Sequence, residues 1–183
     1  MIDAPVLVTL ANAGRPRRVA GAREATVEDP FARADPATRL LGEFLGREVL
    51  AGELDGLRRL AAEAGRIADA LDRGSAPPLG GLNRIATESV GHPQALLTPA
   101  GALHATVIWE PGPAAAELAR LVVDELGGIE PSRVRRCARP ECDLIFYDSS
   151  RSGTQRWHSE DPCGWRERQR RRRAPREARG PNT

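Results

Sequence analysis

The amino-acid sequence predicts a mainly α-helical protein with one small β-hairpin, followed by a compact C-terminal module that ends in a basic helix. Three observations predict this class. Apolar residues between positions 36 and 126 recur mostly at three- and four-residue steps, the period of amphipathic helices. One alternating stretch around a Pro-Ala-Gly turn is typical of a hairpin. All three cysteines and the densest run of arginine lie in residues 133–179.

The first 52 residues predict a short apolar element, a loop and a helix. Residues 5–10 are apolar and fit either a strand or the first turn of a buried helix. Residues 11–35 are rich in Gly, Pro, Arg and acids, which predicts a loop. A helix is expected from Pro36, with Gly52 breaking it. Its apolar stripe consists of Leu40, Leu41, Phe44 and Leu45.

The next elements are predicted by the same spacing arguments. A second helix is expected over residues 53–73 with Gly74 as its C-terminal glycine, and a third over residues 82–90. Residues 94–98 and 103–110 alternate around the turn, which predicts a half-buried antiparallel hairpin. A last helix, residues 113–126, is expected to end at Gly127-Gly128.

Charge divides the chain into two unequal parts. Residues 133–183 hold 14 arginines and 7 acidic residues, a net charge of +7, whereas residues 1–132 hold 13 arginines and 18 acidic residues, a net charge of −5. A basic end on an acidic body predicts a polyanionic partner for that end alone. We therefore expect a helical domain over residues 1–130, a module over 133–179 and a disordered tail over 180–183. The absence of a long apolar run or a secretion signal predicts a cytoplasmic protein with no membrane partner.

The cysteines have the spacing of a metal site. The pattern Cys137-x4-Cys142-x15-His158-x4-Cys163 forms two short-range ligand pairs with a loop between them. Zn²⁺ accepts thiolate and imidazole together, and four protein ligands leave no open position, so the ion would be structural. Pro140 predicts a turn between the first two cysteines. A disulfide, which would leave one thiol over, and inert thiols remain as alternatives.

Beyond this spacing, the run from Arg135 to Ala174 resembles the CGNR-type zinc finger. The matching pieces are Arg136-Cys137, Cys142, Phe146-Tyr147-Asp148-Ser149-Ser150-Arg151, Arg156-Trp157-His158 and Cys163-Gly164-Trp165-Arg166. Two positions depart from the family pattern. His158 stands where the family has a third cysteine, and Trp165 replaces the Asn of Cys-Gly-Asn-Arg. The first change keeps a competent zinc ligand, and the second removes a polar group from the start of the last helix.

The resemblance implies a treble-clef-like zinc finger that follows an N-terminal ABATE-like domain for ligand sensing or dimerisation. It also implies a bacterial transcription regulator, of a family in which some members are described as stress-induced, and a homodimer is one expected form. Within the finger, we expect residues 144–147 to form a strand. Trp157 should join the apolar residues over the metal, and a helix should run over residues 165–173, with Pro175 ending or kinking it.

Double-stranded DNA is the partner that the basic helix predicts. Arginine binds phosphate in a bidentate manner, so several guanidiniums on one helix would neutralise several phosphates. The alternative is a solvated basic tail without sequence preference. The candidate DNA-binding residues are Arg156, Arg166, Arg168, Arg170, Arg171, Arg172 and Arg173.

A small-molecule effector is a further expectation for the N-terminal domain. Its candidate contacts are Asn83, Arg84 and His104, with Trp109 as a wall. The plainer alternative places Trp109 in the core and His104 on the surface.

Two other functional classes stay open. One is an enzyme of small-molecule metabolism on the same scaffold, with Asp148, Glu160 or Asp161 as a base; a full ligand shell argues against it. The other is an RNA- or protein-binding adaptor, in which an exposed Trp165 or Tyr147 would stack on unpaired bases.

Overall fold

The computed structural model describes residues 6–13, 15 and 29–177, with side chains up to residue 172. The predicted tail, residues 180–183, and most of the predicted loop lie outside these residues. About half of the chain is helical and two small two-stranded sheets are present, which confirms the predicted class. The five helices of the body are α1 (Val6–Ala13), α2 (Ala34–Leu45), α3 (Leu54–Asp72), α4 (Gly80–Ala86) and α5 (Ala114–Gly128).

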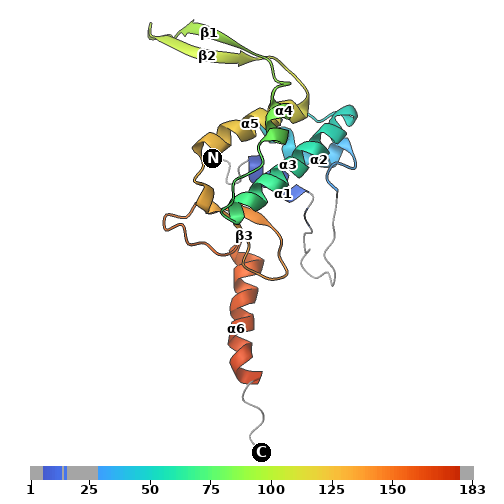
Figure 1. Ribbon diagram of the computed structural model, residues 1–183, viewed down its shortest axis with the longest axis vertical. Helices are drawn as coiled ribbons and strands as arrows, with labels where there is room; N and C mark the ends of the chain where they lie inside the picture. The colour runs from blue at the N-terminus through green and yellow to red at the C-terminus, as the bar shows by residue number, and fades with distance from the viewer. Residues whose placement is uncertain (1–5, 14, 16–28, 178–183) are drawn as a thin grey trace, which may run out of the picture.

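The core forms around α3, which packs against α1, α4 and α5 (Figure 1). Its apolar stripe, including Leu57, Leu60 and Ile67, is fully buried. The apolar run at the N-terminus is resolved in favour of a helix: Leu7 and Leu10 of α1 are also fully buried. A run buried on most sides carries no periodicity, which is why the sequence left helix and strand open.

A helix ends earlier than predicted where another glycine precedes the expected one. Helix α2 ends at Leu45 because the next residue, Gly46, adopts φ +67°. Gly52 therefore does not end this helix. Gly52 instead lies in the single 3₁₀ turn η1 (Ala51–Glu53) that leads into α3. The predicted end of α3 is confirmed, because Gly74 follows it with φ +64°.

Helices α4 and α5 also depart from their expected bounds. Helix α4 ends four residues before Val90, and Val90 joins the hairpin by accepting the backbone N–H of Glu110 (2.9 Å). Helix α5 continues through both glycines and ends only at Gly128. The α-helical φ and ψ angles are open to glycine, so the Gly-Gly pair weakens the helix without stopping it.

The hairpin consists of β1 (Gly91–Leu97) and β2 (Leu103–Trp109), paired antiparallel with Ala95 opposite Ala105. The expectation of a half-buried hairpin is wrong. Most of its residues are exposed on both faces, and the hairpin projects away from the helical body (Figure 1). Alternation predicts only that two faces differ, whereas burial depends on what packs over them.

A second strand pair joins the C-terminal part to the body. After the 3₁₀ turn η2 (Pro131–Arg133), β3 (Val134–Arg136) pairs antiparallel with β4 (Ile145–Tyr147), which confirms the strand expected there. Val134 and Ile145 are 1% exposed and belong to the same apolar core as the body helices. The strand pair lies against α1 and α3, so the C-terminal module rests on the helical core.

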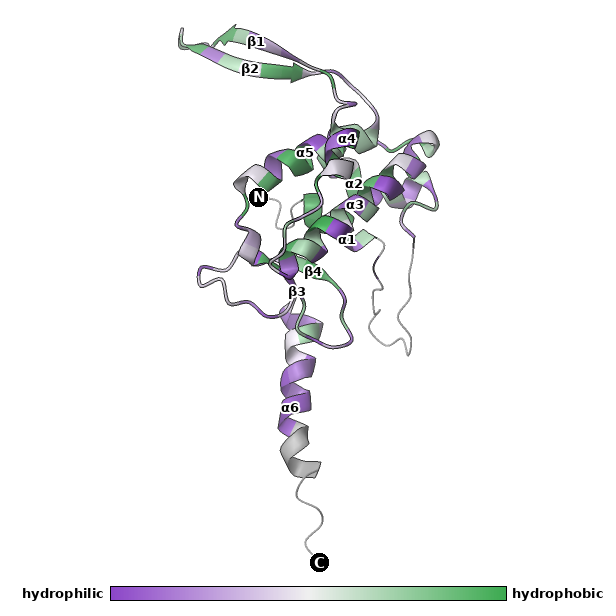
Figure 2. Cartoon of the chain, in the orientation of Figure 1, coloured by the Kyte–Doolittle hydropathy of each residue, from purple (hydrophilic) through white to green (hydrophobic). Residues whose placement is uncertain are grey.

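The chain ends in α6 (Trp165–Glu177), which extends away from the body (Figure 1). It passes through Pro175 instead of ending at Arg173. Most of its described part is strongly hydrophilic, as Figure 2 shows, in contrast to the apolar hairpin. No helix in the described ranges combines the length and apolar composition needed to cross a membrane.

Candidate metal centre

The first half of the centre is a turn that follows β3. Cys137 is the residue after this strand, and its backbone N–H donates to the Leu144 carbonyl (2.9 Å). The Cys142 N–H donates to the Arg139 carbonyl (2.9 Å), which closes the turn around Pro140. Both thiols therefore face the same side of the turn, as the sequence predicted for a metal knuckle.

The second half is supplied by residues 156–164. The Ala138 N–H donates to the Arg156 carbonyl (2.8 Å), which holds this segment against the first turn. His158 follows two residues later. Cys163 lies in a short helical turn, η3 (Glu160–Gly164), that leads directly into α6. The last candidate ligand is thus two residues before the basic helix.

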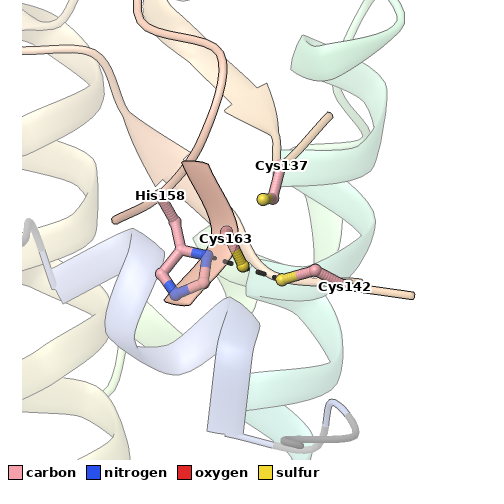
Figure 3. Close-up of side chains that lie close together, drawn as sticks. All are labelled: Cys137, Cys142, His158 and Cys163. Atoms are coloured by element: carbon pink, nitrogen blue, oxygen red, sulfur yellow. Dashed lines mark hydrogen bonds between the residues drawn. The ribbon is translucent and has the colours of Figure 1, made fainter. Parts of the chain in front are cut away.

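These segments bring the four candidate ligands together. The ligand atoms of Cys137, Cys142, His158 and Cys163 all lie within 4.8 Å of one another (Figure 3). A tetrahedral ion with bonds of about 2.0 to 2.3 Å would place its ligand atoms about 3.3 to 3.8 Å apart. The group therefore has the size and the donor set of a metal centre.

The histidine ring is oriented toward the thiols. His158 Nδ1 lies 3.4 Å from Cys142 Sγ (Figure 3). Its other ring nitrogen, Nε2, lies 3.2 Å from the Ser159 hydroxyl. A contact to the second ring nitrogen fixes ring orientation and tautomer, which is the usual support for a ligating histidine. The ring can thus present Nδ1 to an ion.

Burial disfavours thiolates in this group when no cation is present. Desolvation, with the neighbouring Cys137 and Cys163 thiols, raises the pKa of Cys142 to about 12. Desolvation and Cys137 also raise the pKa of Cys163. Three thiolates this close repel one another, and a divalent cation would remove that repulsion.

One buried cation beside the thiols was not singled out by sequence. Arg139 is 9% exposed and pairs with Glu141 (2.9 Å). Burial lowers the pKa of Arg139, but hydrogen bonds to Glu141 and to the Cys163 thiol more than offset this. In the sequence, the sole indication of a role for Arg139 in the centre was its position between the first two cysteines. Sequence spacing does not indicate which arginine is buried.

Asp148 organises the loop between the two halves of the centre. The side chain is fully buried and accepts the backbone N–H groups of Ser150 (3.0 Å) and Gln155 (2.8 Å). Burial raises the pKa of Asp148, but these two bonds, the Ser150 hydroxyl and the Arg135 charge lower it by more. The pKa of Asp148 therefore lies below its ordinary value. With its lone pairs engaged, Asp148 closes a turn and is poorly placed to act as a base.

Trp157, which was expected to join the apolar residues over the metal, is half-buried and is not part of the apolar core cluster of the described residues. Its Nε1–H is buried and has no hydrogen-bond partner among the described residues. Glu160, another candidate base, is exposed and pairs with Arg168. Asp161 is exposed in the η3 turn.

The candidate DNA-binding arginines are not equivalent. Arg168 pairs with Glu160, while Arg170 (2.9 Å) and Arg171 (3.3 Å) both pair with Glu167. Arg172 is exposed with no acidic partner within the described ranges, and Arg166 is half-buried. The Arg156 guanidinium lies 5.6 Å from the Trp157 ring centroid. The Arg173 side chain lies outside the described part.

The candidate effector residues are separated by the structure. Asn83 and Arg84 lie on α4, and Arg84 lines an open hollow of about 690 Å³ with Arg59 and Arg66. Trp109 lines a different hollow of about 300 Å³, where the Arg120 guanidinium stacks on its ring at 4.5 Å. His104 is exposed on the hairpin. Trp109 is 42% exposed, so the alternative that made it a core residue is wrong.

Comparison with protein-family models identifies one match in the chain. Residues 133–176 match the family described as the CGNR zinc finger. The matched segment contains all four clustered ligands, so this part of the chain is similar to CGNR zinc fingers in both its sequence and its donor set. No curated protein matches the chain.

Proposed function

We propose that the protein is a DNA-binding transcription regulator in which a structural Zn²⁺ fixes the base of a basic arm. The observation that carries this proposal is the position of Cys163, a clustered ligand two residues before α6. An ion bound by Cys137, Cys142, His158 and Cys163 would have a filled tetrahedral shell and no site for substrate. Its role would be to hold the start of the helix.

The charge of α6 supports a nucleic-acid partner. The helix carries seven arginines and two glutamates, a net charge of +5, on a segment that extends away from the acidic body (Figure 2). Arg172 is the most available of the described guanidiniums, because Arg168, Arg170 and Arg171 already have acidic partners. Arg172 should therefore contact phosphate directly, while the paired arginines must first exchange partners.

A salt titration with duplex DNA tests this proposal. Arg172→Ala should weaken binding and reduce the slope of log affinity against log salt by about 0.9, the value for one phosphate contact. Arg39→Ala is the matched control, since Arg39 is an exposed arginine on α2. Equal slopes for wild type and Arg172→Ala, or equal losses in both variants, would contradict a specific role for α6.

A second candidate is favoured by Trp165, which is 53% exposed at the base of α6. An exposed indole beside arginines is suited to stacking on an unpaired base. Tyr147, the other aromatic considered for stacking, is half-buried near the Glu130 N–H (3.4 Å). The same titration with single-stranded RNA separates the two functions. Tighter binding to RNA than to duplex DNA, lost in Trp165→Ala, would select the adaptor.

An effector remains part of the proposed regulator. The hollow beside Arg84 is the larger of the two that the candidate residues line. Glu63, which pairs with Arg66, and Glu88 also line it, so Arg59 and Arg84 are the arginines that would suit an anionic metabolite. A thermal-shift screen against small carboxylates and phosphates tests this, because a ligand of the folded state raises the melting temperature. A shift that persists in Arg84→Ala would place the ligand elsewhere.

A further inference from the structure

The β1–β2 hairpin is a projection without acidic or basic residues, and among the described residues its side-chain contact with the body is the stacking of Arg120 on Trp109. Residues 91–109 contain no Asp, Glu, Lys or Arg. An isolated two-stranded hairpin is marginally stable in water, and natural proteins protect exposed strands with charges. Seven of the large apolar side chains exposed in the described ranges lie on or beside this hairpin. They are Val90, Leu96, Leu97, Leu103, Val107, Ile108 and Trp109.

The strand register divides these side chains between two different faces. Residues that are directly opposite in an antiparallel pair share a face. One face, called here the hairpin apolar face, carries no polar side chain. It consists of Gly91, Pro93, Ala95, Leu97, Leu103, Ala105, Val107 and Trp109. The other face is mixed, because His92, Gln94, His104 and Thr106 lie there with Leu96 and Ile108.

The exposed area of the hairpin apolar face approaches that of a specific interface. Leu97 is 70% exposed, Leu103 82%, Val107 41% and Trp109 42%. At roughly 150 to 250 Å² for a large side chain, these four leave about 450 Å² of apolar area uncovered, or about 900 Å² for two copies. With the smaller side chains and the backbone of the face, a symmetric pair approaches the 1,000 Å² or so that a specific interface needs.

We propose that a second copy of this chain covers the hairpin apolar face, with the two hairpins packed face to face. A two-fold axis makes one surface its own partner, so a face with no charged or polar side chain of its own can meet an identical face without repulsion. The Arg120 guanidinium stacks on the Trp109 ring at one end of the face, so the contact would be centred on Leu97, Leu103 and Val107. The two hairpins would form a small two-layer sandwich about 10 Å thick. The hairpin and α6 lie at opposite ends of the molecule (Figure 1), so both basic arms stay free.

An edge-to-edge pairing is the competing arrangement, and the register makes it testable. The backbone hydrogen bonds from Thr98 to Ala102 (2.8 Å) and from Glu110 to Val90 (2.9 Å) fix the alternation of hydrogen-bonded pairs. This alternation directs the backbone N–H of Ala105 outward on β2. On β1 the missing N–H of Pro93 falls on the outer edge, which blunts that edge. Only β2 therefore offers a continuous edge.

Sedimentation velocity of the full chain over a range of concentrations tests the proposal. Wild type should form a concentration-dependent dimer. Leu103→Glu, which removes little internal packing because Leu103 is 82% exposed, should raise the dimer dissociation constant at least about tenfold. His104→Glu is the matched control on the mixed face and should leave the dimer unchanged. Circular dichroism checks that each variant is folded.

Three outcomes would overturn the proposal. A wild-type chain that stays monomeric at about 100 µM would leave the face to another partner, since this is well above the range expected for a specific interface. Equal effects of Leu103→Glu and His104→Glu would show that the apolar face is not the contact. Loss of the dimer in Ala105→Pro with retention in Leu103→Glu would establish edge pairing instead.

Discussion

Asn12 of α1 makes two hydrogen bonds with the backbone of Ile145, the first residue of β4. The Asn12 amide donates to the Ile145 carbonyl (2.7 Å) and its side-chain oxygen accepts the Ile145 N–H (2.9 Å). Asn12 is 9% exposed and Ile145 1%. One side chain thus satisfies a strand edge that would otherwise be buried without partners. The zinc-finger domain and the helical body are joined by this contact.

Removing the Asn12 side chain should destabilise the protein. Asn12→Ala leaves the Ile145 N–H and carbonyl buried without partners, at an expected cost of about 2 to 4 kcal/mol for the pair. Denaturant unfolding measures this as a lower midpoint at unchanged slope. Thr9→Ala, at a half-buried residue of the same helix, is the control. A loss below about 0.5 kcal/mol would show that water replaces both bonds.

The metal centre should hold one equivalent of zinc. Protein purified without added zinc should contain one Zn²⁺ per chain, and Cys142→Ser should contain far less, since the hydroxyl is a poor ligand at neutral pH. Elemental analysis of both proteins measures the difference. His158→Cys should retain the metal, because it restores a fourth thiolate. Retention of a full equivalent by Cys142→Ser would exclude Cys142 as a ligand.

Arg139 should tune zinc affinity without being a ligand. Its buried guanidinium contacts the Cys163 thiol, so Arg139→Met should weaken metal retention by about 10- to 100-fold, the range for groups that support ligands. Competition with a chromogenic chelator measures this. Arg120→Met, at a half-buried arginine on α5, is the control. Unchanged retention in both variants would make Arg139 a packing residue only.

Glu53 should contribute stability that depends on pH. Its hydrogen bonds from Arg47 lower its pKa to about 2, while burial opposes this and the Leu50 and Ala114 N–H groups add to it. Because the folded pKa is depressed, the stabilisation is complete above the unfolded pKa of about 4.5 and is lost as the pH falls toward 2. The full difference is on the order of 3 kcal/mol.

Comparison with Glu53→Gln isolates this effect from the other carboxylates. The stability difference between wild type and Glu53→Gln should be constant between about pH 5 and 7 and should shrink steadily below pH 4. Urea unfolding at each pH measures it. A difference that does not change with pH would mean that Glu53 acts through its hydrogen bonds alone and not through its charge.

Glu167 should limit DNA binding by α6. It is 5% exposed and accepts hydrogen bonds from Arg170 and Arg171, so Glu167→Gln would release two guanidiniums for phosphate. Affinity for duplex DNA should rise, and the salt slope should steepen by about one to two units. Fluorescence anisotropy at two salt concentrations measures both. Glu48→Gln on the body controls for net charge, and an equal rise there would contradict a local role.

The features that could be predicted from the sequence are those that depend on a few neighbouring residues. The spacing of the cysteines and His158 was sufficient to locate the ligand cluster, because each short pair is closed by its own turn. The end of α3 at Gly74 followed from glycine's freedom at positive φ. Tertiary properties could not be predicted in this way. The hairpin shows regular alternation but no described segment covers its faces, and α6 passes through Pro175 without ending there.

The residues that connect distant segments of the chain could not be predicted from the sequence either. Asn12 lay in an expected loop, yet it is the last but one residue of α1 and links segments 133 positions apart. Arg15 and Arg136 likewise meet at Asp69 (2.5 and 2.7 Å), an acid on the far end of α3. A contact between distant segments produces no periodic pattern in the sequence, so it can be recognised only in the folded structure.

The attachment of α6 at Cys163 makes the helix a lever. At 1.5 Å per residue its 13 residues extend about 20 Å from the last sulfur atom, with no described contact to steady the far end. A tilt of about 10° at that pivot would sweep the tip through about 3.5 Å, further than a hydrogen bond tolerates. The bond angles at the metal ion would therefore determine the direction of α6 and, with it, which positions on a partner its arginines can contact.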